Sequence, residues 1–217
     1  MRFPNAFSGV KKIWLAELLM LLAAVIGIVL LVVVIGNTTV VDNTVIVNEA
    51  AIETPTAILG LGATLIALIA FILNLVGLIK ARKDDDGFSI ALIVTMLGII
   101  ASVISSIWSN NQGLTRWMDA IKSICNLFAS YYVLTGIANL AEKFPDSATK
   151  ALALKSRTML EGTFCATVLF KLAINIFNIQ DGSTVYTVLS VIALVLEIVS
   201  YILYLRALNQ GKKMLAK

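Results

Sequence analysis

The chain contains no histidine, only two cysteines and three prolines, and little charge. Charged residues make up 14% of its 217 residues. The absence of histidine removes the commonest metal ligand and the side chain that titrates near neutral pH. The sequence also has no glycine-rich phosphate loop, serine elbow or metalloprotease motif. We therefore expect a non-enzymatic protein with no catalytic residues, no bound metal and no cofactor.

Apolar residues, in contrast, are abundant and stand in long runs. Hydrophobic residues make up 59% of the chain, and its mean hydropathy is +0.93. Such a composition is typical of membrane proteins, because a water-soluble globule would have too few charged groups to cover its surface. The net charge of +4 lies in short basic flanks between apolar runs and forms no continuous patch. We therefore expect the lipid bilayer, and no nucleic acid, as a partner.

Six apolar segments are long enough to cross a membrane, which takes about 20 residues for roughly 30 Å of hydrocarbon. They predict an all-α, polytopic integral membrane protein, a six-transmembrane-helix bundle that forms a single domain over residues 1–217. The arrangement leaves open a repeat of three parallel helical hairpins. The predicted spanning helices cover about 13–36, 56–80, 89–109, 117–141, 158–178 and 184–208.

Segments outside the spans carry weaker patterns. At the amino end, Phe3, Phe7, Val10 and Trp14 stand at helical spacing, which predicts a short interfacial helix in the headgroup region. The β-branched residues within 37–55 indicate an extended stretch.

Two smaller features have simple interpretations. The aspartates within 84–86 are interpreted as a solvated loop. Cys125 and Cys165 fall inside apolar segments and are interpreted as small core residues.

Lysine and arginine positions predict the orientation, because these residues are retained on the cytoplasmic side of a membrane. With both termini in the cytoplasm, only Arg116 lies outside, and Lys122 and Lys171 lie within helices. This asymmetry favours the plasma (inner) membrane with cytoplasmic termini. The cytoplasmic set is Arg2, Lys11, Lys12, Lys80, Arg82, Lys83, Lys143, Lys150, Lys155, Arg157, Arg206, Lys212, Lys213 and Lys217.

Polar residues form one stripe on each of the last four predicted helices when every residue advances by about 100°. Serine, threonine and asparagine stripes either join membrane helices or line a hydrated site between them. Lys171 and Glu197 lie near the middle of their spans, where a charge costs about 2.5 to 3.5 kcal/mol, and we predict that they pair. The candidate ligand-binding or polar core residues are Thr95, Ser102, Asn126, Lys171, Asn175, Glu197 and Tyr201.

Two functions fit this pattern. The first is transport or binding of a small polar or anionic solute at the polar site between the third and sixth helices, with Lys171 holding an anionic group and Glu197 as its counter-charge. The second is a non-catalytic membrane subunit or scaffold that packs with partner membrane proteins or with itself. The two readings differ in whether the polar site is hydrated or filled.

Overall fold

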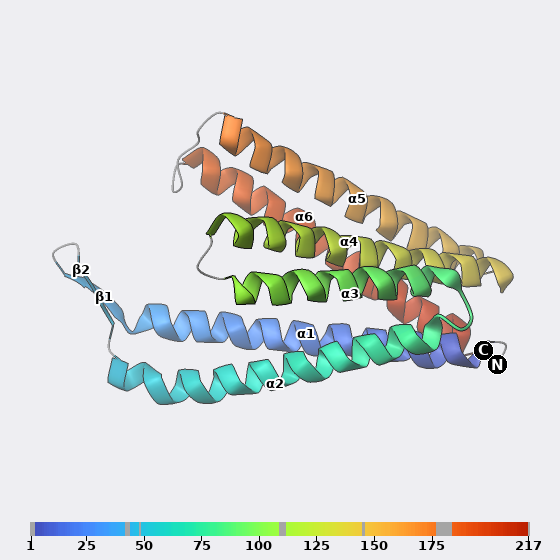
Figure 1. The fold of residues 1–217 in the computed structure, drawn as a ribbon, viewed down its shortest axis with the longest axis horizontal. Coiled ribbons are helices and arrows are strands. Elements are labelled where there is room, and N and C mark those ends of the chain that lie inside the picture. The colour runs from blue at the N-terminus through green and yellow to red at the C-terminus, as the bar shows by residue number, and fades with distance from the viewer. Residues whose placement is uncertain are drawn as a thin grey trace. The chain divides into compact units, whose positions relative to one another are not determined.

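The computed structural model describes residues 3–41, 44–47, 49–108, 112–144, 146–176 and 184–216. Within them the chain is almost entirely helical, which confirms the all-α prediction (Figure 1). The elements are α1 (Pro4–Gly36), β1 (Thr38–Val41), β2 (Thr44–Val47), α2 (Glu49–Ala81), α3 (Asp86–Ile107), α4 (Gln112–Lys143), α5 (Ser147–Ile176) and α6 (Thr184–Leu215).

Five of the described helices begin earlier than the apolar runs predict, whereas α6 begins at Thr184 as predicted. The expected interfacial helix is not a separate element, because α1 continues from Pro4 to Gly36 without a break. Similarly, α5 begins at Ser147, well before the predicted start at 158, and Asp146 accepts a hydrogen bond from the backbone N–H of Thr149 at 2.9 Å. Hydropathy locates the part of a helix that lies in lipid, whereas capping residues determine where the helix starts.

The extended stretch predicted after the first helix is confirmed. β1 and β2 form an antiparallel hairpin in which Val40 pairs with Val45 and Val41 with Thr44. β-branched residues favour such pairing because their side chains fit a pleated surface.

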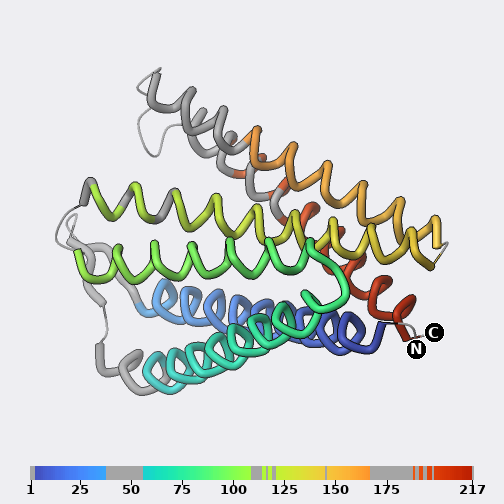
Figure 2. The backbone as a smooth tube through the Cα atoms, turned by 45° about the vertical axis from the view of Figure 1, so that its right-hand side comes forward, coloured from blue at the N-terminus to red at the C-terminus, as the bar shows by residue number. Residues whose placement is uncertain are grey.

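The chain divides into two compact units, and the single domain over residues 1–217 stays a prediction. Unit 1 contains residues 1–11 and 78–217, and unit 2 contains residues 12–77. In unit 1, α4 packs against α3, α5 and α6, and α5 packs against α6. Figure 2 shows α3 and α4 side by side along their lengths. α4 is therefore the central helix of unit 1.

Glycines allow α3 and α4 to approach closely. A Cβ on Gly136 would lie 2.7 Å from Cε2 of Phe88, and a Cβ on Gly87 would lie 2.8 Å from the backbone nitrogen of Gly136. Phe88 is fully buried. The close-packed core lies at this end of unit 1, where the other large buried side chains are Leu78, Leu134, Ile137, Leu140, Leu208 and Leu215.

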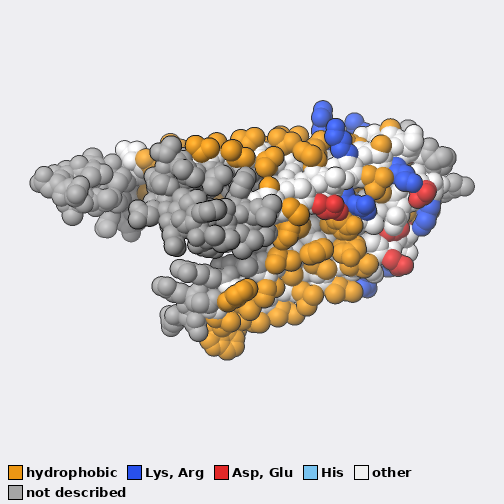
Figure 3. All heavy atoms as spheres, turned by 90° about the horizontal axis from the view of Figure 1, so that it is seen from above, with side chains coloured by type: hydrophobic (Ala, Val, Ile, Leu, Met, Phe, Trp, Pro, Cys, Tyr) orange, Lys and Arg blue, Asp and Glu red, His pale blue; other side chains and the backbone are white. Residues whose placement is uncertain are grey.

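Four helices among the described residues are long and apolar enough to cross a membrane: Pro4–Gly36, Thr56–Ala81, Asp86–Ile107 and Ile121–Lys143. Their large apolar side chains are widely exposed, with Ile28 at 62% and Leu61 at 68%. Among the described residues in view, Figure 3 shows many hydrophobic side chains at the surface. Exposed apolar surface of this extent is typical of contact with lipid.

Candidate functional site

Four of the seven predicted site residues have described side chains, and they belong to α3, α4 and α6. Thr95 donates to the carbonyl of Ala91 in its own helix at 2.8 Å. Ser102 is half-buried, and Asn126 is exposed. Tyr201 is half-buried, with its ring 6.4 Å from that of Tyr204.

The other three predicted site residues are Lys171, Asn175 and Glu197. Their backbones belong to α5 and α6, but their side chains lie outside the described residues. The ion pair between Lys171 and Glu197 therefore stays a prediction.

Polar side chains do join α5 to α6 elsewhere, along a seam made by Ser156, Thr163 and Ser200. The buried Ser156 hydroxyl lies 2.8 Å from the carbonyl oxygen of Leu152 in α5 and 3.1 Å from that of Leu203 in α6. The hydroxyls of Thr163 and Ser200 hydrogen-bond to each other, and Ser200 is 1% exposed. Ser200 of α6 therefore has a packing role toward α5.

The aspartate loop between α2 and α3 is a second polar centre. Asp84 accepts hydrogen bonds from Asn5 Nδ2 at 3.2 Å and from the backbone N–H of Ala6 at 2.6 Å. Because both donors are in the first turn of α1, Asp84 ties the start of the chain to this loop.

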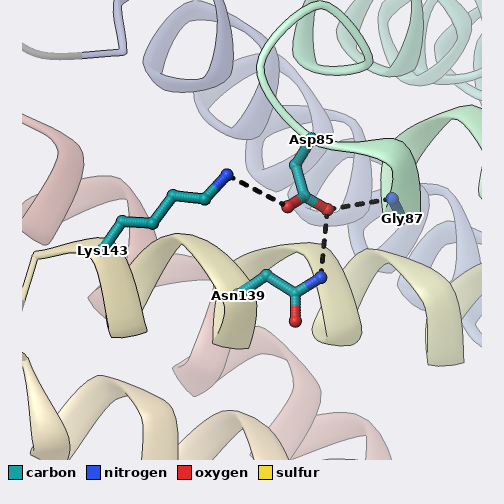
Figure 4. Close-up of polar contacts among 4 residues, drawn as sticks. All are labelled: Asp85, Gly87, Asn139 and Lys143. Carbon is teal, nitrogen blue, oxygen red and sulfur yellow. Dashed lines mark hydrogen bonds and ion pairs between the residues drawn. The ribbon is translucent and has the colours of Figure 1, made fainter.

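Asp85 connects the same loop to α3 and α4. Its Oδ1 accepts from the backbone N–H of Gly87 at 2.9 Å and from Asn139 Nδ2 at 3.4 Å, and its Oδ2 lies 3.9 Å from Lys143 Nζ (Figure 4). The Asp85 side chain is only 6% exposed. The solvated-loop interpretation is therefore wrong for Asp84 and Asp85, whereas Asp86 is exposed. Three aspartates before Gly87 and Phe88 are an N-cap signal, but the sequence does not tell which of the three caps α3.

Aromatic contacts add to the attachment of the amino-terminal segment. The rings of Phe3 and Phe144 meet edge to face at 5.4 Å, and Lys143 Nζ lies 5.7 Å from the centre of the Phe3 ring. Together with Asp84, these contacts join the start of α1 to the end of α4 within unit 1.

A mainly apolar groove of about 250 Å³ lies between α4 and α5. Beside it, Arg157 Cζ lies 5.0 Å from the centre of the Tyr131 ring, and Arg157 Nε lies 3.9 Å from Glu161 Oε1. Cys165 lines this groove and is exposed, so its interpretation as a core residue is wrong, while that of the buried Cys125 is confirmed. The groove is lined by Leu127, Phe128, Tyr131, Leu160, Glu161, Phe164 and Cys165.

Lysines from both ends of the chain come close together in unit 1. Lys80 Nζ donates to the Ser8 hydroxyl at 3.5 Å. The pKa of Lys212 is lowered from its ordinary value by burial and then by the positive charges of Lys213 and Lys11. The first turns of α1 therefore lie within electrostatic range of the last turn of α6.

Comparisons with known proteins give no match: no protein-family model, curated protein or solved structure is similar to this chain. Among the residues that the structure describes, no group of histidine, cysteine, aspartate and glutamate side chains is arranged to hold a metal ion.

Proposed function

We propose that the chain crosses the membrane six times and that both termini lie in the cytoplasm, in the plasma (inner) membrane. Four described helices are suited to span. α5 and α6 are of similar length; α5 includes the apolar run from 158 as far as Ile176, and α6 includes the run 184–208. The proximity of Lys11 to Lys212 also supports an even number of crossings, which places both ends on one side.

A reporter fused after Lys217 tests this topology. A reporter active only in the cytoplasm should give full signal, and one active only outside should give none. The matched control is the same pair of reporters fused within the β1–β2 hairpin, where the signals should be reversed. Activity of the outside reporter at Lys217 would contradict the proposed topology.

Within this architecture, we propose that the protein acts as a non-catalytic membrane subunit or scaffold. The observation that carries this proposal is the α5–α6 seam, in which the hydroxyls of Ser156, Thr163 and Ser200 are directed at the neighbouring helix or its backbone. Hydroxyl groups of this kind stabilise helix packing in lipid. Thr95, in contrast, donates to a carbonyl of its own helix.

Solute binding is the second candidate, and the observation that favours it is the position of Lys171 and Glu197. Each lies in the apolar run of its helix, α5 or α6. Ionisable residues at such depth commonly mark ion or solute paths in membrane proteins.

Thermal unfolding in detergent separates the two functions. For a scaffold, inorganic phosphate, acetate and glutamate should leave the melting temperature unchanged. The double variant Lys171→Met, Glu197→Leu should be more stable than either single variant. Each single substitution would leave one charge without its partner, which destabilises a protein more than removing both charges does. Lys122→Met, which removes an exposed lysine from α4, is the matched control.

A solute site would give the opposite result. One of the three anions would raise the melting temperature of the wild type and of Lys122→Met. The shift would disappear in Lys171→Met at normal expression. That outcome would overturn the scaffold proposal.

A further inference from the structure

The groove between α4 and α5 is apolar along most of its length and has one charge of each sign toward the α4–α5 connection. Glu161 is the charged residue of its lining. Arg157 stands beside it, because the guanidinium carbon lies 5.0 Å from the centre of the Tyr131 ring, which is also part of the lining. Leu127 and Cys165 line the part of the groove farther from the connection. All of these residues belong to unit 1.

The two charges are paired only loosely. Arg157 Nε lies 3.9 Å from Glu161 Oε1, which is beyond hydrogen-bond distance. This buried Nε has no hydrogen-bond acceptor among the described residues. The side chains of Arg157 and Glu161 are 31% and 50% exposed. Both charged groups can therefore bind a further molecule, and that molecule must carry charges of both signs, because a lone anion would be repelled by Glu161 and a lone cation by Arg157.

The charged end of the groove lies near the cytoplasmic edge of the membrane in the proposed topology. The apolar helix α3 begins at Asp86, and the ring of Phe88 packs against Gly136 of α4. Tyr131 is five residues from Gly136, or about 7.5 Å along α4. An arginine at this depth reaches the lipid headgroups with its guanidinium while its stem lies along apolar surface. The rest of the groove then extends toward the bilayer centre, at the level of the acyl chains.

We propose that the groove binds one phospholipid whose headgroup carries a phosphate and a primary ammonium, as that of phosphatidylethanolamine does. The phosphate accepts hydrogen bonds from the guanidinium of Arg157, and the ammonium donates to the carboxylate of Glu161. Arginine suits a phosphate because its planar guanidinium donates two parallel hydrogen bonds. An acyl chain lies along the apolar lining, which includes Leu127, Phe128 and Phe164.

Two other common headgroups fit these charges less well. The quaternary ammonium of phosphatidylcholine has no N–H group to donate to Glu161. Phosphatidylglycerol has the phosphate but no cation, so its negative charge meets the carboxylate of Glu161 without compensation. The site rests on the proposed crossing of the membrane by α4 and α5, and it does not depend on whether the protein is a scaffold or binds a solute.

Cys165 provides a local measure of occupancy. It is exposed and lines the groove, so a bound acyl chain should shield its thiol from N-ethylmaleimide. Cys125 is the other cysteine of the chain, and it is buried. The substitution Cys125→Ala makes Cys165 the single thiol, and every protein in the test carries it.

The test measures the alkylation rate of Cys165 in the full chain, purified in uncharged detergent. The micelles contain phosphatidylethanolamine or, at the same mole fraction and with the same acyl chains, phosphatidylcholine. Phosphatidylethanolamine should slow alkylation about threefold relative to phosphatidylcholine when it is present at about twice its dissociation constant.

Two variants test the assigned contacts. Glu161→Gln, which changes an exposed side chain, should remove the difference between the two lipids. Arg157→Gln should weaken protection by phosphatidylethanolamine as well, because the phosphate loses its donor. The controls are Glu142→Gln and Lys155→Gln, which remove one charge of each sign from exposed positions, and both should keep the wild-type protection.

Four outcomes would overturn the proposal. Equal protection by phosphatidylethanolamine and phosphatidylcholine would mean that the groove accepts acyl chains of any lipid. Equal protection by phosphatidylglycerol, or unchanged protection in Glu161→Gln, would mean that the ammonium is not recognised. Equal protection by glycerophosphoethanolamine, the headgroup without acyl chains, would identify a site for a water-soluble zwitterion. The reporter at Lys217 tests the topology separately, so absent protection with cytoplasmic reporter activity rejects this site alone.

Discussion

The carboxylate of Asp84 accepts a hydrogen bond of 2.6 Å from the backbone N–H of Ala6, 78 residues away in the chain. The first turn of a helix has backbone donors without partners inside the helix, and a side chain at the N-cap commonly accepts from one of them. Phe3 precedes α1 and has no side-chain acceptor. Asp84 therefore supplies from the α2–α3 loop the cap that the local sequence lacks.

Replacing Asp84 with alanine should destabilise unit 1 by about 0.5–2 kcal/mol, the usual effect of losing an N-cap. The free energy of unfolding, measured by titration with a denaturing detergent, gives this value. Asp86→Ala is the matched control because Asp86 is exposed, and it should change stability by less than about 0.5 kcal/mol. Equal effects of the two substitutions would contradict the capping role of Asp84.

Replacing Gly136 with alanine should destabilise the protein by about 1–3 kcal/mol, the usual effect of overpacking a core. The added Cβ would lie 2.7 Å from the fully buried ring of Phe88. Gly162→Ala is the control, because nothing lies within 4 Å of a Cβ at Gly162, and it should be neutral or stabilising. Thermal unfolding in detergent measures both changes.

A double variant checks that the clash is the cause. Gly136→Ala combined with Phe88→Leu should lose less stability than the two single variants lose in sum, because leucine leaves free the space that the new Cβ requires. Simple additivity would mean that Gly136→Ala acts through something other than Phe88.

Replacing Ser200 with alanine should lower stability by about 0.6 kcal/mol, the average value of a hydrogen bond between membrane helices. Ser200 is 1% exposed and bonds to Thr163 across the seam. Ser106→Ala is the control, because Ser106 is exposed and donates to the carbonyl of Ser102 in its own helix. A larger loss at Ser106 than at Ser200 would argue against a packing role for the seam.

Stability should rise with pH in alkaline solution, in part because of Lys212. Its pKa is lowered from 10.5 by burial, Lys213 and Lys11. Between the lowered pKa of the folded protein and 10.5, the unfolded chain binds more protons than the folded one, so the free energy of unfolding increases with pH. Below that range both states are protonated, and the unfavourable contribution of the Lys212 charge is fully present.

Two variants isolate this contribution in uncharged detergent. Lys212→Gln should flatten the rise in melting temperature over this pH range. Lys11→Gln should flatten it partly, because it removes one of the charges that act on Lys212. The same slope in the wild type and both variants would contradict the assigned causes of the pKa shift.

Less of the candidate site than of the fold could be predicted from the sequence. Periodicity predicted polar stripes on the last four helices, but it could not choose between packing and a hydrated site. It made Asn126 a candidate ligand-binding or polar core residue; Asn126 is exposed, and its Oδ1 would lie 3.9 Å from a Cβ on Gly98 of α3. A helical period reports which residues share a face, and the neighbour of that face depends on how the helices pack.

The sequence by itself determined the helical class and the approximate position of every helix. Apolar runs and basic flanks are local properties of the sequence, and the thickness of the bilayer sets how long a spanning run must be. Only the tertiary structure decided the partners of Asp84, Asp85 and Ser156. Their contacts join residues 78, 54 and 47 positions apart. These contacts join different elements of the folded bundle, and the one between Asp85 and Asn139 lies where Gly87 and Gly136 allow α3 and α4 to approach closely.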